Sequence, residues 1–291
     1  MALSRIGLPP LRRVEIAVIV YALLAGLVAA VRTAQFAHAW YAVAAQLLIV
    51  LLVLLTAATA PAHGTRRLPQ RLRDALPLLL LPALYPLLDI VNLAGGVPTW
   101  DALAQRAEAA LFGGQPSRDW WRVSPSVFWS TLLHAAYLSY YALVALPAAY
   151  IVLRGTSAER DMVITRIVVC FLCCYAAFVL VPVAGPYYQF DRPSGAFIEN
   201  LPAQWVYASL HGGSSFGAAF PSSHVAATLT ATLVMLRVRP RVGILMVIPA
   251  LLLCVSVVYC AMHYAVDAIA GAVVGAVVGL WPRRQHGHAP A

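Results

Sequence analysis

Residues 43–60 read VAAQLLIVLLVLLTAATA, a run without a single charged side chain. A transmembrane helix needs about 20 mostly apolar residues to cross the hydrocarbon of a bilayer. This stretch therefore predicts a membrane-spanning helix, and the rest of the chain repeats the pattern. Of the 291 residues, 62% are hydrophobic and 11% are charged, whereas a soluble domain carries about 25% charged residues. The composition excludes a water-soluble globular protein.

Eight stretches are long and apolar enough to be spans. They lie near residues 14–32, 40–61, 75–92, 126–153, 162–182, 221–236, 242–260 and 264–281. We therefore expect an all-α, polytopic membrane helix bundle of about eight transmembrane helices. It divides into two N-terminal helices (1–74), a six-helix core (75–281) and a short cytoplasmic tail (282–291).

The arginine distribution predicts the orientation. All 20 basic residues are Arg, and the net charge is +9. Cytoplasmic loops of membrane proteins are enriched in Arg and Lys. If the N-terminus is inside and the spans alternate, 15 Arg fall inside and 5 outside. We expect a multi-pass protein of the cell membrane, the inner membrane in a bacterium, with both termini in the cytoplasm. The Arg residues are scattered over short loops and form no basic face, which argues against nucleic-acid binding.

Two predicted outside loops, about 93–125 and 183–220, are long enough to hold a substrate entrance or a lid. In the first, residues 100–112 have the apolar spacing of a helix that lies along the membrane surface. The second is rich in Gly, Pro and Ser. Both loops belong to the face that points away from the cytoplasm.

A histidine and an aspartate lie one helical turn apart where the seventh predicted span ends and the eighth begins. Residues 256–267 read SVVYCAMHYAVD, which contains His263 and Asp267. Residues four apart on a helix share a face, so the carboxylate can hold the imidazole, fix its tautomer and stabilise its cation. An acid in a span costs about 2.5–3.5 kcal/mol at the bilayer centre and less at its edge. The pair predicts a nucleophile with its orienting group.

A second motif, Pro221-Ser222-Ser223-His224, opens the sixth predicted span. Pro is favoured in the first turn of a helix and Ser at its cap. The free N–H groups of a helix N-terminus bind anions, and His224 could donate a proton to a leaving oxygen. In the predicted topology both motifs lie outside. Together they predict a site for phosphate chemistry on the extracytoplasmic face.

Three other functions share some of these features. Two histidines and one aspartate at an outer rim are also a donor set for zinc. A transporter could use Asp89, Asp267 and the histidines as a relay, although the sequence lacks the paired inverted repeats that many transporters have. A non-catalytic membrane protein that binds lipid is the third alternative.

The two motifs resemble those of the type 2 phosphatidic acid phosphatase superfamily, which includes vanadium haloperoxidases. The family's second motif, Pro-Ser-Gly-His, corresponds to residues 221–224, with Ser223 in place of Gly. Its third motif, Ser-Arg-x5-His-x3-Asp, corresponds to Ser256 through Asp267, with Val257 in place of Arg. The resemblance covers roughly residues 75–281.

The family's first motif, Lys-x6-Arg-Pro, is degraded. Arg192-Pro193 is present, but Gly185 stands at the Lys position. The third motif without its Arg, the run 216–224 (FGAAFPSSH) and the run 181–186 (VPVAGP) are similar to the inositol phosphorylceramide synthase branch. Enzymes of that branch move a phosphorylated headgroup from one lipid to another alcohol.

The resemblance implies roles for the reactive residues. His263 would attack phosphorus, Asp267 would orient it, and His224 would protonate the leaving alcohol or activate the acceptor. A phospho-histidine intermediate would pass its group to water or to a lipid hydroxyl. A phospholipid substrate is implied, with diacylglycerol or ceramide as an acceptor, and no metal or cofactor.

The missing cations bear on the substrate. An Arg or Lys side chain normally stabilises the charge of a phosphomonoester dianion. The loss of these cations therefore favours a less charged phosphodiester as the substrate. Arg192 is the best replacement from the outer loops. The substrate-binding candidates are Ser222, Ser223, Arg192, Ser256, Tyr187 and Asp89. The lipid, the acceptor and the oligomeric state stay open.

Overall fold

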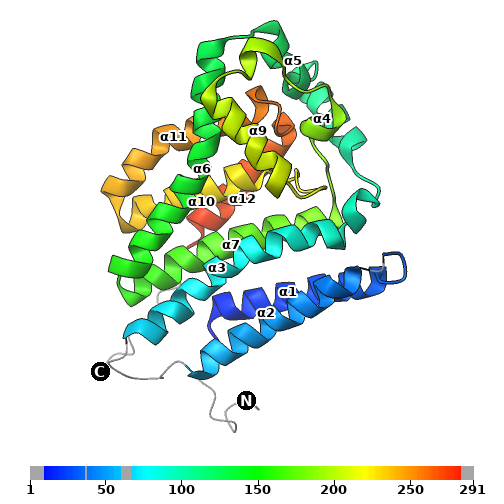
Figure 1. Cartoon of the computed structure of the whole chain (residues 1–291). Coiled ribbons are helices and arrows are strands. Elements are labelled where there is room, and N and C mark those ends of the chain that lie inside the picture. The colour runs from blue at the N-terminus through cyan, green and yellow to red at the C-terminus, as the bar shows by residue number, and fades with distance from the viewer. Residues whose placement is uncertain (1–9, 37, 60–66, 283–291) are drawn as a thin grey trace.

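The computed structural model describes residues 10–36, 38–59 and 67–282. The tail predicted for residues 282–291 lies almost wholly outside this range. The described chain is built from helices, and its β contact is an isolated parallel bridge between Val183 and Ala218. The elements, shown in Figure 1, are α1 (Arg13–Arg32), α2 (Ala39–Thr59), α3 (Arg67–Val91), η2 (Leu93–Gly95), α4 (Asp101–Phe112), α5 (Pro116–Val123), α6 (Val127–Arg154), α7 (Ser157–Leu180), α8 (Pro186–Gln189), η3 (Gly195–Phe197), α9 (Leu201–Gly213), α10 (Ser223–Val238), α11 (Pro240–Tyr259) and α12 (Ala265–Leu280).

Eight of these helices correspond to the eight predicted spans. Six of them, α1, α2, α3, α6, α7 and α11, are long and apolar enough to cross a membrane. The other two, α10 and α12, are apolar but have only 16 residues each. The prediction of an all-α polytopic bundle is confirmed, with the refinement that two of its helices are short.

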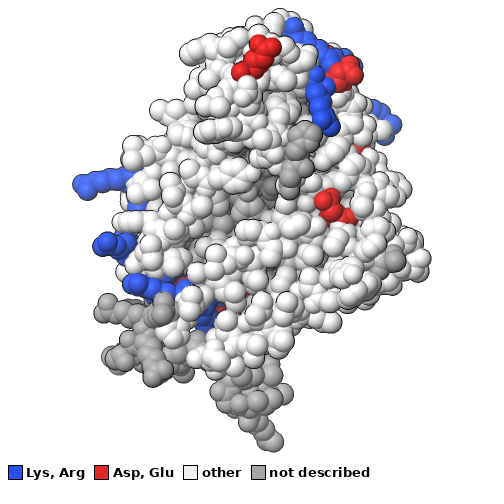
Figure 2. All heavy atoms as spheres, in the orientation of Figure 1, with Lys and Arg blue, Asp and Glu red and all other residues white. Residues whose placement is uncertain are grey.

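The outer surface of the bundle is apolar. Large side chains such as Leu79, Leu146 and Ile248 are exposed. In Figure 2 the Arg, Asp and Glu side chains of the visible face lie mostly toward two opposite ends, with a broad uncharged belt between them. Soluble monomers rarely expose apolar patches of this size. The belt is the lipid-facing surface of a membrane protein.

The two short helices, α10 and α12, pack closely against each other in the middle of the bundle. A glycine recurs every fourth residue along the contact face of α12. A Cβ atom at Gly271 would lie 2.4 Å from the Ser222 carbonyl oxygen, and one at Gly275 would lie 2.7 Å from the Ala226 oxygen. Small residues allow helix backbones to approach in a membrane. This contact brings the N-termini of the two helices together.

The second long loop is more ordered than its composition suggests. Residues 183–220 contain α8, η3 and α9. Asn200 caps α9 by accepting a hydrogen bond from the Ala203 N–H at 3.0 Å, and Pro202 lies in the first turn. An Asn at the N-cap with a Pro in the first turn is a helix-start signal, so this helix was readable from the sequence. The helix expected at residues 100–112 is present as α4.

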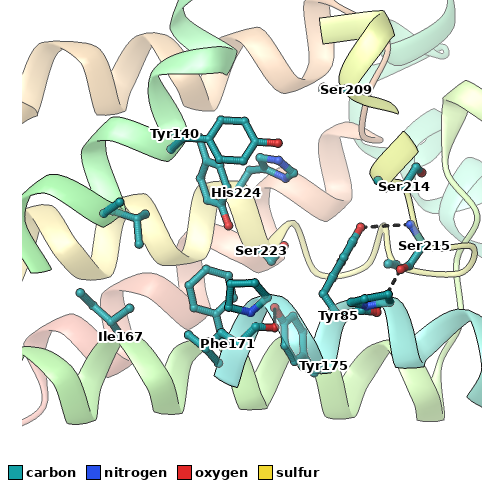
Figure 3. Close-up of a pocket in the computed structure, with 18 of the residues that line it drawn as sticks. Tyr85, Tyr140, Ile167, Phe171, Tyr175, Ser209, Ser214, Ser215, Ser223 and His224 are labelled. Atoms are coloured by element: carbon teal, nitrogen blue, oxygen red, sulfur yellow. Dashed lines mark hydrogen bonds between the residues drawn. The ribbon is translucent and has the colours of Figure 1, made fainter. Parts of the chain in front are cut away.

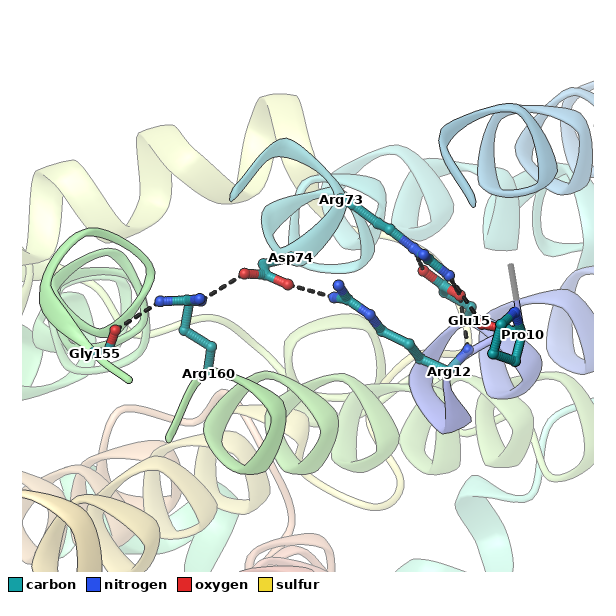
Figure 4. A network of polar contacts seen from close by, with 7 residues as sticks. All are labelled: Pro10, Arg12, Glu15, Arg73, Asp74, Gly155 and Arg160. Carbon is teal, nitrogen blue, oxygen red and sulfur yellow. Dashed lines mark hydrogen bonds and ion pairs between the residues drawn. The ribbon is translucent and has the colours of Figure 1, made fainter. Parts of the chain in front are cut away.

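Ion pairs tie the N-terminal helices to the rest of the bundle (Figure 4). Arg73 of α3 binds the buried carboxylate of Glu15 in α1 with N–O distances of 2.5 and 2.7 Å. Asp74 accepts from Arg12 just before α1 and, at 2.5 Å, from Arg160 of α7. The network lies at the end of the bundle opposite the α10 and α12 N-termini and joins α1, α3 and α7.

Candidate active site

His263 stands in the turn between α11 and α12 and is nearly buried. Its Nδ1 atom lies 3.0 Å from the backbone oxygen of Ala219 and 3.8 Å from the Oδ2 atom of Asp267. A carbonyl can only accept, so Nδ1 carries the proton, and the Nε2 lone pair is left free. The predicted partner, Asp267, is close enough to stabilise a charged ring, but the nearest hydrogen bond is to Ala219.

Asp267 connects the two sequence motifs. Its Oδ2 atom accepts a hydrogen bond from the Tyr264 N–H at 2.9 Å and caps α12. Its backbone oxygen accepts from the Ser222 N–H at 2.9 Å. Its Oδ1 atom is buried and has no hydrogen-bond partner among the described residues. The side chain thus faces His263 while its backbone holds the start of α10.

His224 lies in the first turn of α10, with its ring centroid 5.6 Å from that of His263. Tyr137 and Tyr140 of α6 pack against the ring at centroid distances of 4.7 and 4.3 Å. The Nδ1 atom is buried without a hydrogen-bond partner among the described residues. The ring is therefore held by aromatic contacts.

Both histidines line a cavity of about 910 Å³ (Figure 3). Near them it is lined by tyrosines and serines. Away from them it continues between α3, α6 and α7 and becomes apolar. Its far part is lined by Leu78, Leu79, Ala149, Val152 and Leu153. The cavity thus joins a polar end, which holds the histidines, to a long apolar arm that lies within the membrane-spanning helices.

The three predicted serines differ in their placement. Ser223 lines the cavity. Ser222 is the N-cap of α10, buried, with its hydroxyl accepting from the Val225 N–H at 3.4 Å. Ser256 is buried in α11 and donates to the Leu253 oxygen of its own helix at 2.8 Å. Only Ser223 is placed to touch a substrate, since neither Ser222 nor Ser256 lines the cavity.

The other predicted binding residues lie at the polar end or its rim. Asp89 and Tyr187 line the cavity. The exposed Arg192 stacks on the Tyr187 ring, with its guanidinium carbon 4.1 Å from the centroid. Arg192 therefore stands beside the cavity and contacts it through Tyr187.

Two buried acids of α4, missed at the sequence level, hold the backbone around His263. Asp101 accepts from the N–H groups of Ala184 and Gly185 at 2.9 and 2.8 Å. Glu108 accepts from the Ala265 N–H at 2.7 Å. Burial raises the pKa of the Glu108 carboxyl, and its hydrogen bonds oppose this rise. Asp101 and Glu108 lie seven residues apart and share a face of the helix, but their burial depends on the segments packed against that face.

The departures from the family motifs have structural explanations. Gly185, at the Lys position, has a φ of +92°, and a Cβ there would lie 3.0 Å from the Ala219 side chain. A lysine would be strained in this conformation. Val257, at the Arg position, is fully buried in the apolar core. At both positions where the resembled motifs have a cation, the chain thus has a residue that packs without charge.

The described residues contain no group of three or more His, Cys, Asp and Glu side chains that could hold a metal ion. The sequence profile of the PAP2 superfamily matches residues 105–281. No curated protein and no solved structure matches the sequence. The matched segment begins within α4 and ends just after α12, so it contains both histidines and Asp267.

Proposed function

Because the chain belongs to the PAP2 superfamily, we propose that it is a lipid phosphotransferase or phosphatase in which His263 is the nucleophile. Membership in this superfamily supports phosphatase or phosphotransferase activity on lipids. One observation carries the assignment of the residue. The Nδ1–H of His263 is held by the Ala219 carbonyl at 3.0 Å, which leaves Nε2 unprotonated beside a second imidazole in a membrane cavity.

The proposed reaction has two steps. In the first, His263 Nε2 forms a bond to phosphorus while the bond from phosphorus to the leaving alcohol breaks. The leaving oxygen takes a proton from His224. In the second, an acceptor hydroxyl loses its proton to His224 and attacks the phospho-histidine, and the P–N bond breaks. Asp267, 3.8 Å from Nδ1, stabilises the positive charge on His263 in both steps.

The charge around the cavity favours a phosphodiester over a phosphomonoester. None of the described residues that line it is Arg or Lys, and one is an aspartate. A phosphomonoester dianion would meet a carboxylate and no compensating cation except Arg192 at the rim. Headgroup transfer of the inositol phosphorylceramide synthase kind, or phosphodiester cleavage by water, is the reaction that this balance supports.

The apolar arm fits an acyl chain. Its lining residues on α3 run from Ala75 to Pro86, about 16 Å along the helix axis at 1.5 Å per residue. Burying each CH₂ group contributes about 0.8 kcal/mol. A lipid held in this way would place its phosphate near the histidines, and its acyl chain would remain among the spans.

A labelled phospholipid panel tests the function. The full chain, purified in detergent, is incubated with each lipid, with and without diacylglycerol or ceramide. A released headgroup, with or without its phosphate, indicates a hydrolase, and a new labelled lipid indicates a transferase. We expect His263→Ala to lower kcat by about 10⁴-fold or more, and vanadate to inhibit the wild type.

The exposed His38, in the turn before α2, provides the control. His38→Ala should behave as the wild type. If purified His263→Ala keeps full activity on every lipid that the wild type processes, the mechanism is wrong. If the wild type processes no lipid and does not bind vanadate, the transporter or the non-catalytic alternative replaces the enzyme.

A further inference from the structure

The polar end of the cavity contains an acidic side chain without a basic partner. Asp89 is the only Asp, Glu, Lys or Arg among the described residues that line the cavity. An acid within a membrane-spanning helix is costly and usually has a partner or a function. Inside the cavity, the described chain supplies no cation for it.

The Asp89 carboxylate is held in place by a hydrogen bond, but it can accept more hydrogen bonds. Its Oδ1 atom accepts a hydrogen bond from the Phe216 N–H at 2.6 Å. No described residue donates to its other oxygen. An ionised carboxylate accepts several hydrogen bonds, so this oxygen is available to a ligand in the cavity.

Aromatic rings surround the same place. Tyr85 lies one helical turn before Asp89 on α3, lines the cavity, and accepts a hydrogen bond from the Ser215 N–H at 3.3 Å (Figure 3). The ring of Tyr188 lies 5.4 Å from that of Phe216, the residue that binds Asp89. Tyrosine faces attract cations, and rings combined with an acid are the chemistry that recognises ammonium groups.

One short segment links this place to the nucleophile. Phe216 binds Asp89 through its N–H, and Ala219 binds His263 through its carbonyl. Four residues of chain span at most about 14 Å. The Asp89 site and the His263 site therefore belong to one cavity and are joined by one short segment of chain.

We propose that Asp89, with Tyr85 and Tyr188, forms a subsite for an amine or quaternary ammonium headgroup. This inference rests on the proposed function and specifies its substrate. The phosphodiester lies at the histidines, and the positively charged end of the headgroup pairs with Asp89. A zwitterionic lipid would then bring its own cation to the acid, which an inositol, glycerol or phosphomonoester headgroup does not.

Asp89→Asn tests the subsite, because the amide oxygen can still accept from Phe216 while the charge is lost. Wild type and variant are compared on phosphatidylcholine, phosphatidylethanolamine, phosphatidylinositol, phosphatidylglycerol and phosphatidic acid. The wild type should prefer the first two. In the variant, kcat/KM for those two should fall by about tenfold or more, through KM, while kcat/KM for phosphatidylinositol should not fall.

Asp119→Asn is the matched control, since Asp119 is partly exposed in α5, pairs with Arg118 and does not line the cavity. It should keep the wild-type preference. A His263-dependent activity that prefers inositol, glycerol or monoester lipids, or a preference unchanged in Asp89→Asn, would overturn the subsite and leave the proposed function standing.

A binding measurement separates the subsite from turnover. Tetramethylammonium, the cationic end of a choline headgroup, is titrated calorimetrically into inactive His263→Ala protein and into His263→Ala/Asp89→Asn protein. We expect binding to the first that weakens by about tenfold or more in the second. Equal binding, or none to either protein, contradicts the subsite whether or not the wild type is an enzyme.

Discussion

At the scale of single residues, the imidazole of His263 is oriented by two groups of different strength. The Ala219 carbonyl fixes the tautomer of His263 at 3.0 Å, and Asp267 acts on the charge of the ring from 3.8 Å. The spacing of His and Asp in the sequence predicted the second contact, because helical periodicity places them on one face. The first contact was not predictable, since a backbone acceptor 44 residues away leaves no mark on residue identity.

Asp267→Asn separates these two contributions. The amide oxygen can still cap α12 and Ala219 still fixes the tautomer, so we expect a folded protein whose kcat falls by about 10²-fold or more, as the cationic ring loses its stabilising charge. His263→Ala should cost more, because it removes the nucleophile. Rates and melting temperatures of both purified variants check this order. Equal losses would mean that Asp267 does more than stabilise charge.

At the scale of secondary structure elements, the site depends on a close helix contact. The N-termini of α10 and α12 meet because Gly271 leaves room for the Ser222 carbonyl. The sequence predicted both helices and their polar starts. It did not predict which faces meet, since glycines in an apolar helix are compatible with several contact faces.

Gly271→Val should separate the two helices. Its Cβ would stand 2.4 Å from the Ser222 oxygen, and overpacking costs about 1–3 kcal/mol. We expect a lower melting temperature and a loss of activity as His224 moves away from His263. Gly114→Ala, where an added Cβ meets nothing within 4 Å, should change neither. A fully active Gly271→Val protein would contradict the contact.

The α4 helix holds the turn before α12 through Glu108, and pH reports on this contact. Its pKa is raised in the folded state, so the folded protein binds more protons than the unfolded chain, and stability falls as pH rises above the ordinary value of 4.5. The Glu108→Gln variant has no carboxyl group at this position, so its stability does not fall in this way as pH rises. Its melting temperature should therefore improve relative to wild type as pH rises.

Asp119→Asn gives the opposite sign. Arg118 lowers the pKa of Asp119, so the wild-type carboxylate stabilises the fold at neutral pH and loses this effect as pH falls. The effect of this variant should be small, because the pair is largely exposed. If Glu108→Gln follows the wild type at every pH, the carboxyl does not titrate differently on folding.

At the scale of the whole molecule, the bundle is joined at two ends by different means. Hydrogen bonds from α4 and the 214–222 segment build the end with the histidines. Ion pairs build the other, where Asp74 binds Arg12 and Arg160. The family profile starts at residue 105, so α1, α2 and α3 lie before the matched segment, yet α3 supplies Asp89 and part of the cavity.

Asp74→Ala should loosen the N-terminal helices without touching the chemistry. It leaves two partly buried guanidinium groups unpaired, which costs about 2 kcal/mol or more. We expect a lower melting temperature and an unchanged kcat at permissive temperature. The exposed Asp161 in the first turns of α7 is the control, and Asp161→Ala should leave both values near wild type. If the Asp74→Ala protein melts at the wild-type temperature, the ion pairs of Asp74 are not needed for stability.

The sequence was most informative where a one-dimensional pattern has a direct physical cause. Apolar run lengths predicted the spans, and the spacing of His263 and Asp267 predicted their contact. The three serines show where prediction from the sequence ends. Ser222, Ser223 and Ser256 have equal chemistry, but the helix rotation that exposes only Ser223 to the cavity depends on tertiary packing. The carboxylates of α4 depend on loop geometry, which local pattern does not encode.

The shortness of α10 and α12 has a consequence for the choice of acceptor. Sixteen residues make a rod of about 24 Å, roughly 6 Å less than the hydrocarbon thickness. If the C-terminal ends of both helices are level with the ends of their neighbours, a phospho-histidine formed by the proposed reaction lies below the headgroup plane at the other end. The concentration of water is low at that depth. A lipid alcohol diffuses within the same leaflet, and its hydroxyl group can reach the site. In the proposed reaction, this depth therefore favours transfer to a lipid hydroxyl over hydrolysis.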